Sequence, residues 1–230
     1  MCGRFTLTNS LIWLFGLLKL APINNLIPRY NIAPGQPVLV FLHSPDAGKI
    51  VYDFQIWGLI PSFSKDPKAF KPLINARSET LEAKPSFKKA FQYRRCIIPA
   101  SGFFEWQKVK DGKQPWYFCP NDPDKNFYFA GLWDIWHGPD GEQVNSCAII
   151  TTVANRLVDK IHQRMPVILG EESLLQWLNP AADTRGLKKM LVGYSAADMK
   201  AWQVDRRMNN PGFDSPECLQ PPKIIQPELF

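Results

Sequence analysis

The second residue of the chain is a cysteine that directly follows Met1. Methionine aminopeptidases remove an initiator methionine when the next residue is small, and Cys2 meets that condition. The mature chain would then begin with an amine and a thiol on adjacent carbons, both partly nucleophilic at neutral pH. With an aldehyde, the amine forms an imine and the thiol closes a five-membered thiazolidine ring. The alternative is a small buried cysteine, because free cysteine is among the most buried residue types.

A second candidate group is Glu105, which lies between Phe104 and Trp106. A carboxyl group on an apolar strand has a raised pKa, which suits a general acid that releases an oxygen near neutral pH. Strand alternation offers a competing interpretation, in which Glu105 points to solvent between its aromatic neighbours. The residues alone leave both interpretations open.

His162 is the third candidate, in the segment His162-Gln163-Arg164-Met165-Pro166 after a helical pattern over residues 155–161. A helix C-terminus favours the protonated imidazole, so His162 could orient a substrate or donate a proton. The other two histidines, His43 and His137, lie in turn-like polar segments. A single histidine is also a common structural residue, and that role stays open.

Basic and aromatic side chains alternate downstream of a polar segment at residues 75–80. They are Lys84, Phe87, Lys88, Lys89, Phe91, Arg94 and Arg95. Such a mixture fits a groove that follows phosphates while aromatic rings stack on bases. It fits equally well a solvated helix face with buried phenylalanines.

Several enzyme classes lack their motifs in this sequence. It contains no Gly-rich phosphate loop, no H-E-x-x-H and no G-x-S-x-G, so phosphoryl transfer, zinc proteolysis and α/β-hydrolase chemistry have no support. The cysteines at positions 2, 96, 119, 147 and 218 are odd in number and scattered. This spacing indicates a reducing compartment and argues against a structural zinc. No metal or organic cofactor is indicated.

Composition and charge restrict the number of domains and the kinds of binding partner. The chain has 230 residues, of which 45% are hydrophobic and eight are tryptophan, so it can bury one substantial core. We predict a single domain over residues 1–230. The 27 basic and 21 acidic residues give a formal net charge of +6, which favours an anionic partner without requiring one.

The first twenty residues resemble a signal peptide, but Lys19 stands where cleavage after Ala21 needs a small neutral residue. An amphipathic helix over residues 11–20, capped by residues 8–10, explains this stretch better. No other apolar run has the length to span a bilayer. We therefore expect a soluble, cytoplasmic protein with no membrane partner.

The remaining pattern predicts an α+β fold in which antiparallel sheets curl into a barrel-like core with peripheral helices. Strands are expected at residues 38–43, 49–59, 93–98, 102–107, 116–119, 127–133, 146–152 and 166–169. Helices are expected at residues 11–20, 85–91, 155–161, 171–178 and 196–202. Residues 208–230 contain Asn-Pro-Gly and Pro-Pro steps, which predict an irregular tail over the surface.

Seven short segments, in this order along nearly the whole chain, closely resemble the SRAP (SOS response-associated peptidase) family. They are Met1-Cys2-Gly3-Arg4-Phe5, Arg29-Tyr30-Asn31-Ile32-Ala33-Pro34, Trp57-Gly58-Leu59-Ile60-Pro61, Asn75-Ala76-Arg77-Ser78-Glu79-Thr80, Arg95-Cys96-Ile97-Ile98-Pro99-Ala100, Gly102-Phe103-Phe104-Glu105-Trp106 and His162-Gln163-Arg164-Met165-Pro166. Each segment alone is weakly specific, whereas the ordered set is strongly specific.

The resemblance implies a sensor and shield of abasic sites in single-stranded DNA, expected to act as a monomer and to associate with the nucleoid during DNA damage. By position, Cys2 matches the crosslinking nucleophile, Asn75 the residue that holds its amine and the sugar, Glu105 the acid/base, and His162 the group that assists ring opening. The implied DNA-binding positions are Arg4, Arg77 and Arg164 at phosphates, together with Pro34, Trp57, Phe63, Trp106 and Thr151. The family often has an aromatic pair after the Trp-Gly-x-x-Pro segment, where this chain has Phe63 alone.

The implied product is a thiazolidine crosslink through Cys2, formed after Met1 removal and formed and reversed with the help of Glu105. Two other functions remain open. One is a cysteine-type peptidase, acting on its own first residue or more widely, that uses Cys2, His162 and Asn75. The other is a non-covalent binder of single-stranded DNA in which Cys2 is incidental.

Overall fold

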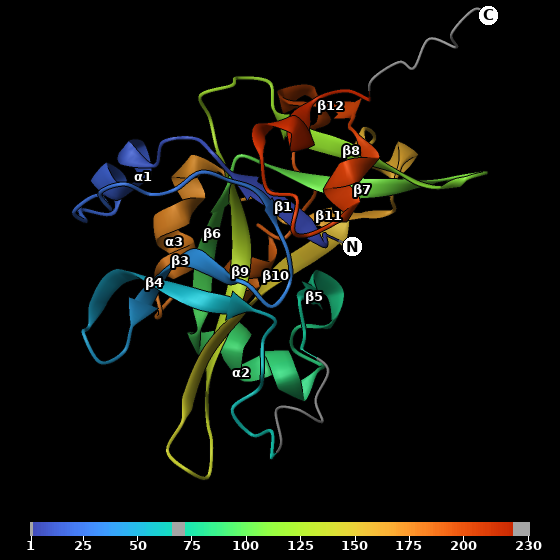
Figure 1. The fold of residues 1–230 in the computed structure, drawn as a ribbon. Helices are drawn as coiled ribbons and strands as arrows, with labels where there is room; N and C mark the ends of the chain where they lie inside the picture. Colours follow the sequence, from blue (N-terminus) through green and yellow to red (C-terminus); the bar gives the residue numbers. More distant parts are fainter. Residues whose placement is uncertain (1, 66–71, 223–230) are drawn as a thin grey trace, which may run out of the picture.

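Five strands close into a barrel within residues 2–65 and 72–222, the part of the chain that the computed structural model describes. In order around the barrel they are β10 (Gln143–Val153), β4 (Lys49–Trp57), β3 (Pro37–Ser44), β6 (Arg95–Ala100) and β9 (Phe127–His137), and β9 pairs back with β10 (Figure 1). The predicted α+β fold with a barrel-like core is confirmed. One pairing departs from the expected antiparallel pattern, since β10 runs parallel to β4.

A second sheet packs beside the barrel and contains the start of the chain. Its strands are, in order, β12 (Met199–Gln203), β8 (Gly112–Pro120), β7 (Gly102–Val109), β1 (Arg4–Leu7) and β2 (Arg29–Ile32). β1 runs antiparallel to β7, with Arg4 opposite Phe104 and Phe5 opposite Phe103. Continuing this register by one residue puts Gly3 opposite Glu105, so Cys2 lies one residue beyond the position opposite Glu105. The sequence pattern did not predict β1, β2 or β12.

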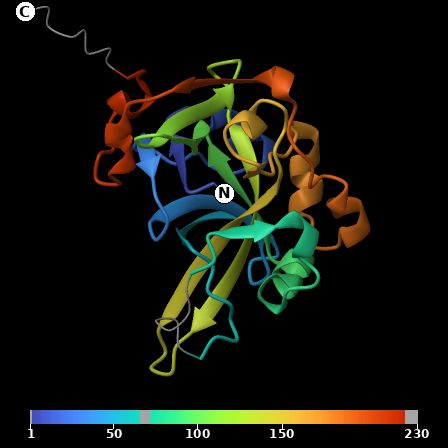
Figure 2. The same cartoon turned by 90° about the vertical axis from the view of Figure 1, so that its right-hand side faces the viewer.

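β10 also pairs with two short strands outside the barrel. β5 (Asn75–Arg77) lies parallel to it and β11 (Arg164–Pro166) lies antiparallel. Thr151 on β10 is opposite both Arg77 and Pro166. Figure 2 shows β5 beside β10, with the C-terminal elements crossing the top of the molecule. This strand therefore brings two of the polar segments together, although they lie far apart in the sequence.

The helices are short and peripheral. They are α1 (Ile12–Leu17), α2 (Pro85–Tyr93), α3 (Leu174–Leu178) and α4 (Thr184–Lys188), with 3-10 helices η1 (Ser78–Thr80), η2 (Val158–Lys160), η3 (Glu171–Ser173), η4 (Ala196–Asp198), η5 (Arg206–Asn209) and η6 (Pro216–Leu219). The helices expected at residues 85–91 and 171–178 are confirmed by α2 and by η3 with α3. In the described ranges, no helix is long and apolar enough to cross a membrane.

Three helix predictions need correction. The pattern at residues 155–161 gives only the single turn η2, and residues 196–202 give η4 followed by β12, because the backbone there pairs with β8. The first helix begins at Ile12 with Leu11 as its N-cap. Leu11 offers no side-chain cap, and of the three residues predicted to cap the helix only Ser10 bonds to its start, since Ser10 Oγ accepts from the Ile12 N–H at 3.3 Å.

Aromatic side chains fix the second sheet against the barrel. The Phe5 ring on β1 meets the Trp57 ring edge-on at 5.1 Å and the Phe129 ring at 5.8 Å between centroids. All three side chains are buried, and such pairs add stability beyond the area that they bury. The strand that follows Cys2 is thus held by packing as well as by backbone pairing.

The C-terminal segment is fastened to β2 by one buried amide. Asn31 Nδ2 donates to the carbonyl oxygens of Met208, Asn210 and Phe213 at 2.9, 3.0 and 2.8 Å. Asn31 Oδ1 accepts from Arg4 Nη1 at 2.8 Å. The predicted irregular tail is therefore ordered in its described part, residues 208–222, where it includes η6.

We expect Asn31→Ala to lower the free energy of unfolding by about 3 kcal/mol, because the carbonyl groups that it satisfies would lose a buried donor. Urea unfolding followed by tryptophan fluorescence measures the change. Asn121→Ala is the matched control, since Asn121 is exposed and its side chain donates to a single carbonyl, that of Ala197; its effect should stay below about 0.5 kcal/mol. Equal effects of the two substitutions would refute the fastening role of Asn31.

Candidate active site at the chain start

Cys2 is fully buried and is separated from β1 by Gly3 alone. Its Sγ donates to the Arg4 carbonyl oxygen at 3.8 Å, and its own carbonyl oxygen accepts from Asn75 Nδ2 at 2.8 Å. Burial, and then the nearby Glu105 carboxylate, raise the pKa of the Cys2 thiol well above its ordinary range. The thiol is therefore neutral at pH 7, and any reaction at sulfur needs a base to take its proton.

Glu105 lies on β7 and is 2% exposed, so it does not point to solvent. Both faces of the strand are covered at this point, since Phe104 is also fully buried, in a second cluster under the C-terminal segment. Burial raises the pKa of Glu105 to about 7. The carboxyl group therefore exists in both protonation states near neutral pH, as a group that gives up and regains a proton must.

Asn75 begins β5, where it lies opposite Ile149 of β10. Its Nδ2 is committed to the Cys2 carbonyl. Its Oδ1 is buried and accepts no hydrogen bond from the residues that the structure describes. A buried acceptor of this kind is costly unless a donor meets it, so Asn75 offers a position for an N–H or O–H group beside Cys2.

His162 faces Glu105, with its Nδ1 4.0 Å from Glu105 Oε1. Nδ1 lies 3.0 Å from the Arg164 backbone nitrogen and 3.2 Å from the Arg164 carbonyl oxygen, so either tautomer of the ring has a backbone partner there. Burial lowers the pKa of His162, and the imidazole is neutral at pH 7. This corrects the expected imidazolium, because the single turn η2 that precedes His162 is too short to supply a helix dipole.

The three arginines of the DNA-binding prediction have different surroundings. Arg77 is exposed. Arg4 donates to Asn31 Oδ1 and to the carbonyl oxygens of Met208 and Asn209 at 2.8, 3.1 and 3.2 Å. Arg164 forms a fork with Glu79, and its Nη2 also donates to the Thr151 carbonyl at 2.6 Å. Two of the three guanidinium groups thus already hold internal partners.

The other predicted DNA contacts divide into exposed and buried residues. Pro34 and Phe63 are exposed, and Trp106 is half-buried, with its Nε1 donating to Asn209 Oδ1 at 2.7 Å. Trp57 and Thr151 are both 0% exposed, so neither presents surface to solvent in this structure, and their contact with DNA stays a prediction. Trp57 belongs to the core and donates from Nε1 to the Ile74 carbonyl at 2.9 Å, next to Asn75.

Glu79 is the site residue to which the sequence assigned no role. Its carboxylate accepts from Arg164 at 2.5 and 3.0 Å, and this hydrogen bond lowers the pKa of Glu79. The signal available in the sequence was an acidic side chain two residues after Arg77 in the segment at residues 75–80. The pair joins the turn after β5 to β11 and so holds the Asn75 and His162 segments side by side.

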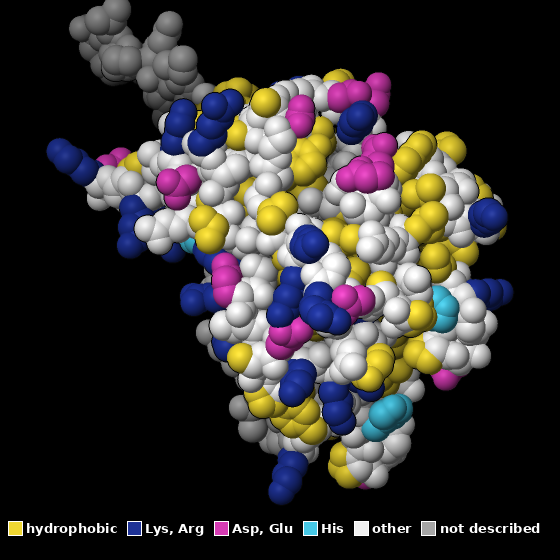
Figure 3. Space-filling view, turned by 180° about the vertical axis from the view of Figure 1, so that it is seen from behind, with side chains coloured by type: hydrophobic (Ala, Val, Ile, Leu, Met, Phe, Trp, Pro, Cys, Tyr) yellow, Lys and Arg dark blue, Asp and Glu magenta, His cyan; other side chains and the backbone are white. Residues whose placement is uncertain are grey.

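Charge on the far side of the molecule is mixed. Figure 3 shows lysine and arginine side chains interspersed with aspartate and glutamate on the face turned away from the viewer of Figure 1. The electrostatic potentials of neighbouring opposite charges largely cancel in solution. The net charge of +6 therefore does not by itself locate an anion-binding face.

Comparison with known proteins extends these observations. The family model for SOS response associated peptidase (SRAP) matches residues 1–211. The abasic site processing protein YoqW of Bacillus subtilis (strain 168) is 40% identical over 224 residues, covering 96% of this chain and 99% of YoqW. The abasic site processing protein HMCES of Gallus gallus is 33% identical over 232 residues, covering 87% of this chain and 68% of HMCES. A solved structure from Bacteroides thetaiotaomicron has a TM-score of 0.81 at 25% identity, covering 96% of this chain and 99% of that one.

The raised pKa of Glu105 makes stability depend on pH. The unfolded chain loses this proton near pH 4.5 and the folded chain near 7, so the folded state loses stability as pH rises between these values, by about 3 kcal/mol. Glu105→Gln removes the effect. Relative to the unsubstituted protein, the variant should gain about that much stability between pH 4 and pH 8 in urea unfolding. An identical difference at both pH values would show that the carboxyl group titrates normally.

Proposed function

Because this chain belongs to the SRAP (SOS response-associated peptidase) family, we propose that it processes abasic sites in single-stranded DNA by forming a covalent thiazolidine at Cys2 after Met1 is removed. The names of YoqW and HMCES as abasic site processing proteins support the substrate class. The convergence of Cys2, Asn75, Glu105 and His162 from four separate segments is the observation that carries the chemistry.

The first step opens the sugar. Abasic deoxyribose is mostly a closed hemiacetal, and its aldehyde appears when the bond from C1′ to the ring oxygen breaks. Glu105, with a pKa of about 7, is partly protonated at neutral pH and gives its proton to the ring oxygen as that bond breaks. The neutral His162 at 4.0 Å from Glu105 helps to orient the sugar and its 1-hydroxyl, whose proton passes to solvent water as the aldehyde forms.

The second step joins the protein to the sugar. The Cys2 amine attacks the aldehyde, and loss of water gives the imine. Asn75 Oδ1, buried beside Cys2, accepts an N–H of that amine and directs its lone pair. The carboxylate that Glu105 now carries takes the proton of the buried thiol, and sulfur adds to the imine carbon to close the ring. Glu105 then passes this proton to the ring nitrogen.

Opposite demands on Glu105 make the reaction reversible. Closing the thiazolidine needs the carboxylate form of Glu105, and reopening the thiazolidine needs its carboxylic acid form. A pKa near the working pH supplies both forms. Exposed Arg77, Pro34 and Phe63 are the surface groups that we assign to the DNA strand. Arg4 and Arg164 act mainly by holding the site together through the internal bonds described above.

Intact mass after mixing with abasic single-stranded DNA tests the proposal directly. The expected product is the chain without Met1 plus the DNA, less one water. Cys2→Ser should still give an imine that borohydride traps, but no stable adduct, because the hydroxyl group is a much weaker nucleophile than the thiol. A peptidase would instead cleave added peptides and leave the DNA free. A non-covalent binder would hold intact and abasic strands equally and gain no mass.

Glu105→Gln should slow both crosslinking and its reversal by about a hundredfold, because one proton carrier serves both directions. In the unsubstituted protein, the sugar-opening step should slow as pH rises above about 7, where Glu105 is ionised. Denaturing gels over a time course give both rates. Glu142→Gln, at an exposed position, is the control and should retain them. Unchanged rates in Glu105→Gln would remove Glu105 from the mechanism.

A further inference from the structure

The β7–β8 hairpin projects from the body of the molecule, with β1 beside its base (Figure 1). β1 pairs with residues 102–104 of β7, whereas β8 pairs with residues 103–109. Strand β7 therefore continues past the start of β1 with β8 as its neighbour. Because Cys2 lies where this extension begins, a DNA strand that is bound at Cys2 and runs along β7 meets the hairpin next.

Positive charge is concentrated at the end of this hairpin, which lies at the left edge of Figure 3. Lys108, Lys110 and Lys113 are exposed, and the turn between the strands contains one acid, Asp111. Asp111 Oδ2 lies 3.9 Å from Arg206 Nη2, so an arginine of the C-terminal segment offsets its charge. Within the described residues, no acidic side chain forms an ion pair with any of the three lysines. The hairpin end is therefore strongly basic.

Two of these lysines lie directly opposite each other. Lys108 of β7 and Lys113 of β8 are cross-strand partners, so their Cα atoms are about 5 Å apart and their side chains leave the sheet on the same face. Like charges in directly opposite positions destabilise a pair of strands. An anion between the two ammonium groups reverses this effect, and each phosphate of a DNA strand supplies one negative charge. The register therefore indicates an anionic partner for this pair.

The face that carries this pair leads back to the candidate active site. Alternate residues of a strand share a face, so Lys108 lies on the same face of β7 as Trp106, the residue after Glu105. Trp106 is half-buried, and Asn209 Oδ1 accepts from its Nε1 at 2.7 Å. An aromatic ring followed by basic side chains along one path suits single-stranded nucleic acid, because bases stack on the ring and phosphates meet the cations.

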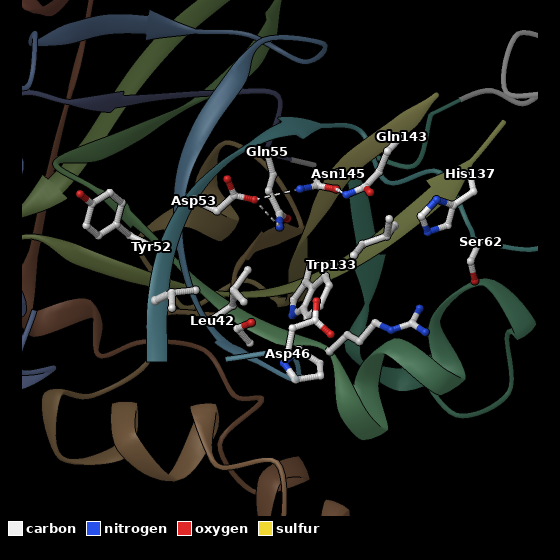
Figure 4. Close-up of a pocket in the computed structure, with 15 residues that line it drawn as sticks. Leu42, Asp46, Tyr52, Asp53, Gln55, Ser62, Trp133, His137, Gln143 and Asn145 are labelled. Carbon is white, nitrogen blue, oxygen red and sulfur yellow. Dashed lines mark hydrogen bonds between the residues drawn. The ribbon is translucent and has the colours of Figure 1, made fainter. Parts of the chain in front are cut away.

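The hairpins at the other end of the barrel differ in charge. β3–β4 and β9–β10 surround a cavity of about 520 Å³ (Figure 4). The acidic side chains that line it are Asp46 and Asp53. Arg94, also in the lining, already forms an ion pair with Asp134. A DNA strand is repelled by this acidic end, so charge favours a path along β7–β8.

We propose that Lys108 and Lys113, together with Lys110, bind backbone phosphates of the single strand on one side of the abasic site. This inference rests on the proposed function, because it places the hairpin along a strand whose lesion lies at Cys2. It adds a phosphate-binding surface to the one assigned to Arg77. Phosphates on one side of the lesion use these lysines, and phosphates on the other side do not.

Binding of a fluorescent single strand with a central tetrahydrofuran, an abasic analogue that has no aldehyde, tests the inference without the chemistry at Cys2. On a strand of about 16 nucleotides, Lys108→Gln/Lys113→Gln should reduce the slope of log affinity against log salt by about 1.4, because each phosphate contact on a single strand contributes about 0.7. Binding should be about 25-fold weaker at about 0.1 M salt and equal when extrapolated to about 1 M. Fluorescence anisotropy over a salt series gives both quantities.

Two further strands locate the contact, each with uncharged methylphosphonate linkages in place of the phosphates on one side of the analogue. The weakening caused by the double substitution should vanish with one of these strands and persist with the other. Lys49→Gln/Lys125→Gln is the control, since it removes the same charge from two exposed lysines outside the hairpin; it should retain the original slope. The urea midpoint of the hairpin variant should be equal or higher, because two opposed like charges are gone.

An unchanged slope in the hairpin variant would overturn the inference, as would an equal loss in the control or any other pattern with the two methylphosphonate strands. A lower urea midpoint would also overturn it, by giving the lysines a structural role. These results would leave the crosslink at Cys2 intact. If the unsubstituted protein bound no abasic strand at all, the proposed function itself would fail, and this inference with it.

Discussion

The pairing of β1 on both of its edges is the constraint on which the candidate site depends. β7 on one side and β2 on the other hold a strand of four residues, and the Phe5 ring anchors it on Trp57 and Phe129. This arrangement fixes Cys2 near a buried carboxyl group. Without it, Glu105 would be an uncompensated acid in an apolar interior, and such a group is costly to bury. The contacts that hold β1 in place therefore also position the reactive groups of the site.

Around this strand, hydrogen bonds between polar side chains and backbone groups hold the segments of the site together. The fork between Arg164 and Glu79 joins the segments of His162 and Asn75, and Asn31 ties Arg4 to the C-terminal segment. Charged side chains held in this way lose little further freedom when a substrate arrives. The unmet Asn75 Oδ1 is different, because it stays available for a group that comes from outside the described residues.

Much of this arrangement was predictable where local chemistry decides it. Hydrophobic alternation located most barrel strands, and the ordered segments from Cys2 to Arg164 named the residues that meet at the site. The sequence could not give the parallel pairing of β10 with β4 or the conversion of residues 199–203 into β12, because both depend on partners distant along the chain. For the same reason, the sequence could not give the burial of Trp57 and Thr151, which the resemblance places among the DNA contacts. Their burial follows from barrel closure and not from their neighbours in sequence.

The position of β10 has a consequence for biosynthesis. This strand pairs with β4, β9, β5 and β11, so the barrel cannot close until residue 153 has left the ribosome. Until then, the apolar inner faces of β3, β4, β6 and β9 lack their last neighbour, and exposed strands of this kind are prone to aggregate. Non-local pairing also slows folding. The nascent chain must therefore pass through a long, open intermediate that is a natural substrate for chaperones.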